Sequence, residues 1–335
     1  MSIKKLAEHL GLSKSTVSRA LNGYHDVNPE TRKKVLQAAK DIGYKPNPTA
    51  KRLASGKSRN VGILLPANSR MFVSPAFSKV LTGASAFLAR HDYQLIATTV
   101  AEWQDESKVY SDFIKSGLVD GLFIVRTRTN DSRIQMLEEQ KFPYVCLGHD
   151  EGYKEDSFVD VDNELALYNL TKRQIDMGHK RVAFLDAPLE LTFSQARKRG
   201  YQKALKEAGI EFDPRLLLNG ELSEEDAIKM ARQVLSLAER PTSILCADDT
   251  MAHGTIAACE ELGYQPGKNI AIAGYGDYEL SRFSKPSITS LKYDTRSVGE
   301  EMAKMMLNKL EKKDFETKNW FYADVVARQS DEVTL

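Results

Sequence analysis

The sequence contains no long apolar stretch. Its apolar runs, such as 61–66 and 121–125, are far shorter than the roughly 20 residues that a membrane-spanning helix requires. The N-terminus carries Lys4 and Lys5 but lacks the apolar core of a secretory signal. We therefore expect a protein that neither spans a membrane nor is secreted, and that resides in the cytoplasm.

Cysteine is scarce as well. Cys146, Cys246 and Cys259 are widely separated and odd in number, so they fit neither a disulfide framework nor a zinc-binding spacing. Such usage is typical of a reduced, intracellular protein. The sequence predicts no metal site and no cofactor.

Common catalytic motifs are missing. The chain has no phosphate-binding P-loop, no Gly-x-Ser-x-Gly elbow, no His-Glu-x-x-His pair and no dinucleotide fingerprint. Asp248 and Asp249 form an adjacent carboxylate pair, but neighbouring residues on one loop point in different directions and no partner is evident. We predict a protein that is not an enzyme, with a carbohydrate-active enzyme as the alternative.

Charge is unevenly distributed along the chain. The 335 residues carry a net charge of +1, with 42% hydrophobic and 28% charged residues, as in a globular protein of two or three domains. Residues 1–60 hold thirteen Lys and Arg against four Asp and Glu (+9), and the remainder holds 34 against 42 (−8). A basic head favours a polyanionic partner, and a solvated basic surface is the alternative.

The basic head has the pattern of three short helices. Apolar residues repeat at helical spacing from Ile3 to Leu10, Gly11 ends that helix, and Ser13 is placed to cap a second helix over 14–22. Asn28 and the proline after it are typical of the start of a third helix. The spacing predicts a helix-turn-helix, with a three-helix bundle of no nucleic-acid role as the alternative.

The second helix offers a face suited to reading DNA. Lys14, Ser15 and Arg19 project away from its apolar stripe, where the N-terminal part of such a helix enters the major groove. Arginine pairs with two acceptors of guanine. We expect contacts to phosphate oxygens from the small polar residues of the same segment: Ser13, Thr16, Ser18 and Asn22.

Residues 47–56 predict a short conditional helix. Pro48 suits its start and Gly56 its end, and helices below roughly 12 residues are marginal alone in water. Leu53 lies among basic residues, as an apolar wedge in the DNA minor groove does, and Lys51 is placed to contact phosphate. A flexible linker is the alternative.

Residues 2–66 resemble the DNA-binding head and hinge of the lactose-repressor family of bacterial transcription regulators. The matching stretches run in order with the family spacing: SKSTVSRALNG (13–23), VNPETRKKV (27–35), GYKPN (43–47) and KRLASG (51–56). The resemblance implies that Lys14, Ser15 and Arg19 read bases and that Leu53 is the minor-groove wedge. It also implies a homodimer whose paired hinge helices lie across a palindromic operator.

After residue 60 the pattern alternates between strand and helix. Parallel sheets with helices on both faces produce this alternation, and the length favours two α/β subdomains with a ligand cleft between them. The predicted strands are 61–65, 94–99, 121–125, 144–147, 181–185, 243–246 and 270–275, and the predicted helices include 76–90, 164–177, 195–208 and 250–262.

The resemblance continues through this region. The stretches VDVDNE (159–164), MGHKRVAFL (177–185), RKRGY (197–201) and IAIAGY (270–275) are similar to the family's effector domain, which is itself similar to periplasmic sugar-binding proteins. It implies an α/β fold with doubly wound parallel sheets and crossovers near residues 161, 291 and 320. The implied domains are a head (1–46), a hinge (47–60) and an effector and dimerisation domain (61–335), the last divided into subdomains 61–160 plus 292–319 and 161–291 plus 320–335.

Polar candidates for the effector site follow predicted strands. Arg197 is expected to open a helix, and its donors suit sugar hydroxyls or a carboxylate; the family places its effector arginine here, and a surface salt bridge is the alternative. Asp248 stands where the family usually has Asn, and Asp249 is a candidate helix cap. Asp277 either replaces the family aspartate missing at Gly276 or is structural.

Three rings complete the candidate site. Phe77 and Phe193 are expected in loops at the cleft, where aromatic faces stack on sugars, with core packing as the alternative. His149 follows a strand and is either a ligand donor or a surface residue. Residues 126–130 either bind ligand or are solvated, and Leu222 stands where some relatives carry a stacking aromatic.

The residues and the resemblance together predict a dimeric repressor of a carbohydrate-utilisation operon. Its effector is expected to be a mono- or disaccharide, and 121–143 with 159–163 resemble regulators of α-glucoside use. We expect it at the nucleoid when bound to operator, without membrane contact, and as a dimer because no heptads follow the last segment. The alternatives are a secreted sugar receptor without regulatory role and an architectural DNA-binding protein.

Overall fold

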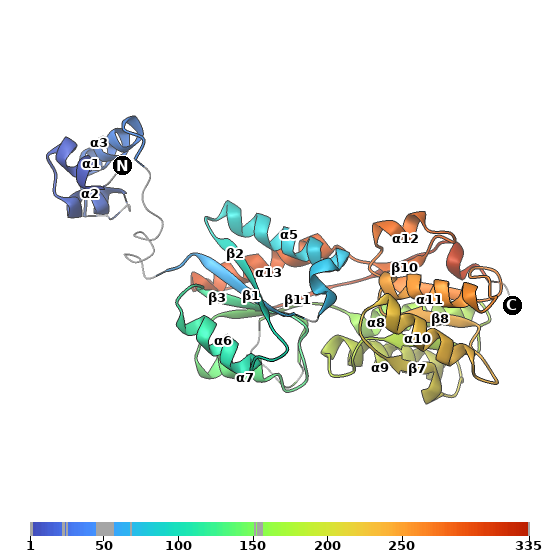
Figure 1. The fold of residues 1–335 in the computed structure, drawn as a ribbon. Helices are drawn as coiled ribbons and strands as arrows, with labels where there is room; N and C mark the ends of the chain where they lie inside the picture. Colours follow the sequence, from blue (N-terminus) through green and yellow to red (C-terminus); the bar gives the residue numbers. More distant parts are fainter. Residues whose placement is uncertain are drawn as a thin grey trace. The chain divides into compact units, whose positions relative to one another are not determined.

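The computed structural model describes residues 3–21, 24, 26–44, 57–67, 69–150, 152 and 157–333 (Figure 1). The chain divides into two compact units, Met1–Arg59 and Asn60–Leu335. Throughout the described ranges, no helix is long and apolar enough to cross a membrane.

Three helices form the described part of the first unit: α1 (Ile3–Leu10), α2 (Lys14–Leu21) and α3 (Pro29–Asp41). Leu6, Val17 and Val35 are fully buried where the helices meet. The caps predicted from sequence are present. Ser13 Oγ accepts a hydrogen bond from the Thr16 amide at 3.1 Å, and Asn28 Oδ1 accepts one from the Glu30 amide at 2.8 Å. These bonds satisfy amides that a helix N-terminus leaves unpaired.

The second unit begins with a parallel sheet in the order β11-β5-β4-β3-β1-β2. We call this sheet and the helices packed on it the N-lobe. Its helices α5 and α13 lie side by side although they are far apart in sequence (Figure 1). The elements are β1 (Asn60–Pro66), η1 (Arg70–Val73), α5 (Pro75–Arg90), β2 (Gln94–Val100), α6 (Glu106–Lys115), β3 (Gly121–Ile124), α7 (Ser132–Glu139), β4 (Tyr144–Leu147), β5 (Phe158–Val161), α13 (Thr295–Leu310) and β11 (Lys318–Phe321).

A second sheet has the order β12-β10-β9-β8-β6-β7, parallel except for the β10–β12 pair. We call it, with its helices, the C-lobe. The elements are α8 (Asn163–Asp176), β6 (Val182–Asp186), α9 (Thr192–Glu207), η2 (Pro214–Leu216), β7 (Leu217–Asn219), α10 (Glu224–Leu235), β8 (Ser243–Cys246), α11 (Asp249–Glu261), β9 (Ala271–Tyr275), α12 (Glu279–Phe283), β10 (Thr289–Lys292), β12 (Asp324–Val326) and η3 (Gln329–Asp331).

The chain passes between the lobes at three places within the described residues: from β5 to α8, from β10 to α13 and from β11 to β12. Each lobe is therefore assembled from segments distant in sequence. Residues at the carboxyl ends of strands from both sheets, among them β5, β8 and β9, surround the same region, which is where open α/β sheets bind ligands.

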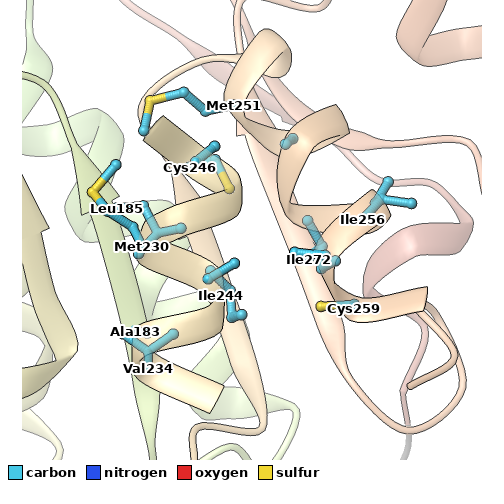
Figure 2. Close-up of a cluster of buried hydrophobic side chains, with 14 of the residues drawn as sticks. Ala183, Leu185, Met230, Val234, Ile244, Cys246, Met251, Ile256, Cys259 and Ile272 are labelled. Carbon is cyan, nitrogen blue, oxygen red and sulfur yellow. The ribbon is translucent and has the colours of Figure 1, made fainter. Parts of the chain in front are cut away.

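The packing of the C-lobe core explains why its central strands appear in the sequence as short apolar runs. Side chains of β6, β8 and β9 pack against α10 and α11 (Figure 2). Ile244, Cys246 and Ile272 are at most 1% exposed. Strands of a parallel sheet are covered on both faces, so apolar residues occupy successive positions and do not alternate with polar ones.

The predicted fold class is confirmed: a helical head precedes an α/β region with two mainly parallel sheets. The strands β5, β7, β10, β11 and β12 have no counterpart among the predicted strands. Each has three or four residues, of which at least one is polar or charged. None therefore forms the continuous apolar run that identified the equally short β3 and β4. One helix start is also corrected, since α9 begins at Thr192 and not at Gln195.

Candidate functional site

The outward face of α2 carries the residues predicted to read DNA. Lys14, Ser15 and Arg19 are exposed, while Val17 and Ala20 are buried against the other two helices. Ser13 and Thr16 lie at the N-terminus of the helix, with their hydroxyl oxygens 2.8 Å apart, and Ser18 is half-buried. This face has the composition that major-groove recognition requires.

Arg19 has partners within the head. Its guanidinium forms an ion pair with Asp26, and its Cζ lies 5.4 Å from the centre of the Tyr24 ring. Asn22, Lys51 and Leu53, the other predicted DNA contacts, lie outside the described residues.

A cavity of about 540 Å³ lies between the two lobes of the second unit. This volume is within the range of small-molecule sites. Four of the predicted effector residues line it: Phe77, Phe193, Arg197 and Asp248. The sequence reasoning did not single out several other lining residues, among them Asp160, Asn163, Tyr275 and Tyr278.

Arg197 is held in a fixed orientation beside the cavity. Its Nε donates to Asn163 Oδ1 at 2.9 Å and its Nη1 donates to the carbonyl oxygen of Ala247 at 3.0 Å. The guanidinium lies 4.0 Å from the centre of the Tyr275 ring and 4.7 Å from that of Phe193. A guanidinium has five N–H donors, so donors remain for a ligand. The predicted position is corrected: Arg197 is in the second turn of α9, one turn after its start.

Asp248 and Asp249 have different environments. Asp248 caps α11, because its Oδ1 accepts a hydrogen bond from the Met251 amide at 2.8 Å. Asp249 is completely buried and accepts hydrogen bonds from the Tyr278 amide and Ser290 Oγ. The cap predicted for Asp249 is therefore supplied by Asp248.

Loss of water on burial raises the pKa of Asp248 to about 6, and Asp249 nearby adds to the shift. Close to neutral pH, this carboxyl can therefore either donate or accept a hydrogen bond at the cavity wall.

Phe77 and Phe193 both line the cavity, but from helices and not from loops. Phe77 is the third residue of α5 and is 6% exposed, and Phe193 is the second residue of α9 and is half-buried. The loop prediction was wrong for Phe193 because α9 begins at Thr192 and not at Gln195. Phe77 falls inside the helix that the sequence itself predicts over 76–90. Leu222 also lines the cavity, as an aliphatic side chain.

His149 is not among the residues that line the cavity between the lobes. Its Nδ1 lies 2.7 Å from Asp160 Oδ2, and its ring stacks on Phe158. Asp160 does line the cavity, and Asn163 connects it to Arg197. His149 therefore holds the carboxylate of a residue that lines the cavity, and its role as a direct ligand donor stays a prediction. Asp160 and Asn163 belong to the VDVDNE stretch, which was the available signal for them.

Asp277 is also absent from the cavity lining. Burial alone would raise its pKa, but hydrogen bonds from Arg328 and Arg282 hold the pKa below its ordinary value. Of the two interpretations from sequence, the structure supports the structural one, because both carboxylate oxygens are occupied by arginines.

Several contacts join the lobes along one side of the cavity. Thr127 Oγ1 and Thr192 Oγ1 are 2.7 Å apart, and the Thr192 amide donates to the Thr127 carbonyl at 2.9 Å. Arg126 pairs with Glu221 at 3.5 Å. Arg70 pairs with Glu224 and Glu225, each at 2.9 Å. The residues 126–130 that the sequence left open therefore take part in contacts between the lobes.

Asp186 is a buried carboxyl at the end of β6. Burial raises its pKa to about 6, Ser194 Oγ donates to its Oδ2 at 2.6 Å, and within the described chain its Oδ1 has no hydrogen-bond partner. A carboxyl with a raised pKa in the folded state holds its proton more tightly than in the unfolded chain. Its contribution therefore favours folding below about pH 4 and is lost as the pH rises through 6.

We expect Asp186→Asn to be more stable than the wild type at about pH 8, by on the order of 2 kcal/mol, because the variant buries no charge there. The difference should shrink steadily as the pH falls toward 4. Thermal unfolding of both proteins across this range measures it. A difference independent of pH would contradict this assignment.

The chain matches two family models: bacterial regulatory proteins, lacI family, over residues 2–47, and periplasmic binding protein-like domain over residues 171–330. It is 34% identical to the HTH-type transcriptional regulator AglR of Rhizobium meliloti (strain 1021), over 98% of this chain and 94% of that protein.

Two solved structures are also similar. One is the transcriptional regulator CelR–cellobiose complex, with a TM-score of 0.76, 26% identity and coverage of 98% of this chain and 99% of that chain. The other is the lac repressor dimer bound to operator and the anti-inducer ONPF, with a TM-score of 0.83, 23% identity and 98% of each chain covered, which shows the shared fold.

A basic helix-turn-helix unit followed by a two-lobed unit with a ligand-sized cavity defines a ligand-responsive DNA-binding regulator. The chain belongs to the lacI family of bacterial regulatory proteins. The members named here are transcription regulators and not enzymes, so the chain is a DNA-binding transcription regulator.

Proposed function

We propose that this regulator represses a carbohydrate-utilisation operon and that a small sugar, bound between its lobes, controls its affinity for operator DNA. The observation that carries this proposal is the cavity in which Arg197, flanked by Phe193 and Tyr275, faces the same space as Asp248. The similar CelR structure holds cellobiose, which supports a sugar as the class of effector.

The cavity suits a neutral mono- or disaccharide. Its volume of about 540 Å³ accommodates two sugar rings. Polar groups of both donor and acceptor type face it, and aromatic rings provide surfaces for sugar faces. An α-glucoside stays our proposal for the specific ligand.

Each lining residue has a proposed role. Arg197 and Asp248 bind hydroxyl groups of the sugar at the C-lobe wall. Asp160 lies next to the crossover between the lobes, is held there by His149, and accepts a hydrogen bond from a sugar hydroxyl. Phe77 and Phe193 pack against the sugar ring from opposite lobes.

On the DNA side, we assign base contacts to Lys14, Ser15 and Arg19, in keeping with their exposure on α2. Phosphate contacts fall to the smaller polar residues of the segment, and the hinge residues keep the roles expected from sequence: Ser13, Thr16, Ser18, Asn22 and Lys51 contact phosphate, and Leu53 enters the minor groove. A homodimer places two such heads on the half-sites of a palindromic operator.

Control requires the sugar to favour one arrangement of the lobes over another. A ligand that contacts both lobes stabilises the arrangement in which they are joined, together with the Thr127–Thr192 and Arg126–Glu221 contacts. Differences of affinity between two states typically supply 1–3 kcal/mol of coupling. We propose that the altered lobes separate the hinge segments of the dimer and release DNA.

The function is tested with the full-length protein. A thermal-shift screen of mono- and disaccharides should yield a stabilising sugar, and that sugar should change binding to a palindromic duplex selected from a random library. If a sugar binds without changing DNA affinity, the protein is a sugar-binding protein without regulatory response. If the sugar is converted to product, the carbohydrate-active enzyme alternative is correct.

The hydrogen bond between Thr127 and Thr192, which joins the lobes, leads to a second prediction about sugar affinity. Thr192→Val removes one hydroxyl of the Thr127–Thr192 pair, which does not line the cavity, and should weaken sugar affinity about fivefold, the effect of one hydrogen bond. Adding Thr127→Val should cause little further loss, because the bond is already broken. Thr99→Val, at an exposed position of β2, is the matched control. Equal effects of Thr192→Val and Thr99→Val would contradict the role of these contacts.

A further inference from the structure

Arg19 of α2 is held by two residues of the loop that follows the helix. Its guanidinium is paired with the Asp26 carboxylate and lies over the Tyr24 ring. The loop is itself anchored: the Tyr24 amide donates to the Arg19 carbonyl at 3.1 Å, Arg32 Nη2 donates to the Tyr24 carbonyl, and Val27 is buried in the core of the head.

Asp26 is one of four acidic residues among residues 1–60. The other three lie on the helices: Glu8 pairs with Lys4 along α1, Glu30 is in the first turn of α3, and Asp41 accepts a hydrogen bond from Gln37 at the end of α3. Asp26 instead neutralises an arginine on the face that carries the other candidate base contacts, Lys14 and Ser15.

A guanidinium can be contacted along more than one edge. An arginine paired with a carboxylate on one side keeps further N–H groups for two acceptors on the other, such as N7 and O6 of guanine. The same carboxylate disfavours a phosphate group at Arg19, because two anions then compete within a few ångströms. The pair therefore favours a base contact over a backbone contact.

We propose that Asp26 is a specificity-determining residue of this regulator: it positions Arg19 for guanine and prevents Arg19 from serving as a general phosphate contact. This inference rests on the proposed role of Arg19 in reading DNA. Such selectivity works by weakening the competing interaction as well as by improving the intended one.

The test compares Asp26→Asn with Asp41→Asn in the full-length protein. Both changes remove one negative charge from the head, and Asp41 is exposed and away from Arg19. Binding is measured to a palindromic duplex selected by the wild type and to a random duplex. Asp26→Asn should lower the ratio of specific to random affinity about tenfold, which is part of the roughly hundredfold discrimination of two arginine–guanine pairs in a dimer, whereas Asp41→Asn should leave the ratio near that of the wild type.

Salt dependence supplies a readout that a merely structural effect does not produce. If Arg19 becomes a phosphate contact in Asp26→Asn, the slope of log K against log salt on random DNA should steepen by about two for the dimer, one for each subunit, relative to Asp41→Asn. In an Arg19→Ala background, Asp26→Asn should cause no further loss of the affinity ratio. In the wild-type background, Asp26→Glu should retain part of the affinity ratio, because it keeps a carboxylate near Arg19.

The outcomes separate two failures. If the wild type selects no sequence from the library, the proposed function fails. If it selects a sequence but Asp26→Asn and Asp41→Asn change the ratio and the slope equally, or Asp26→Asn acts without Arg19, then only the role of Asp26 is overturned. Thermal unfolding of each variant excludes loss of the folded head as the cause.

Discussion

Arg197→Ala is expected to lose at least about a hundredfold in affinity for the sugar that the screen identifies. The substitution removes charge-assisted donors to the ligand. In a buried site it also leaves the Ala247 carbonyl without its arginine donor and Asn163 Oδ1 with only the Tyr275 hydroxyl, at 3.3 Å. Truncating one member of such a buried charged contact typically costs 2–5 kcal/mol, and each 1.4 kcal/mol is a factor of ten.

Titration calorimetry of the full-length protein measures this loss. Arg197→Lys should lose most of the affinity as well, because a lysine is a point charge and cannot reproduce the planar fork between two rings. Arg199→Ala, on the same helix but paired with Glu164 and away from the cavity between the lobes, is the control and should bind normally. Unchanged affinity in Arg197→Ala would place the sugar elsewhere.

Arg19→Ala should abolish most of the regulator's preference for its selected duplex. Loss of one bidentate contact at each half-site of a dimer removes discrimination twice, so the specific affinity should fall by about a hundredfold. Binding to random DNA should change little, because Arg19 is paired with Asp26 and is not expected to contact phosphate.

Lys51→Ala provides the contrast for this result. As a phosphate contact, it should weaken binding to both duplexes alike and reduce the salt slope by about two for the dimer, one for each subunit. Fluorescence anisotropy with both duplexes at several salt concentrations distinguishes the two patterns. Should Arg19→Ala behave in the way described here for Lys51→Ala, the assignment of base reading to Arg19 would be wrong.

The local signals in the sequence were sufficient to predict the helices of the head. Ser13 and Asn28 are strong caps, and the apolar residues between them repeat at helical spacing, so α2 and α3 begin where the sequence predicts. The order of strands and helices was likewise sufficient to predict the α/β fold class, because parallel sheets need a crossover connection, usually a helix, between neighbouring strands.

The site was predicted less completely, because side-chain direction depends on packing. Asp248 and Asp249 are neighbours with the same chemistry, yet one caps a helix at the cavity and the other is buried beneath it. His149 follows a strand as a ligand donor does, but its ring stacks on Phe158 and its Nδ1 contacts Asp160, which itself lines the cavity.

The sequence by itself determined the class of this protein, because the caps, the charge asymmetry and the strand–helix alternation are local properties of the chain that can be recognised from the sequence. Only the tertiary structure decided which polar groups share a cavity and that Asp26 is paired with Arg19. The physical reason is that the cavity residues come from segments distant along the chain, and that the Arg19–Asp26 pair depends on the conformation of a loop. Their contacts follow from how the helices and sheets pack, which no local pattern encodes.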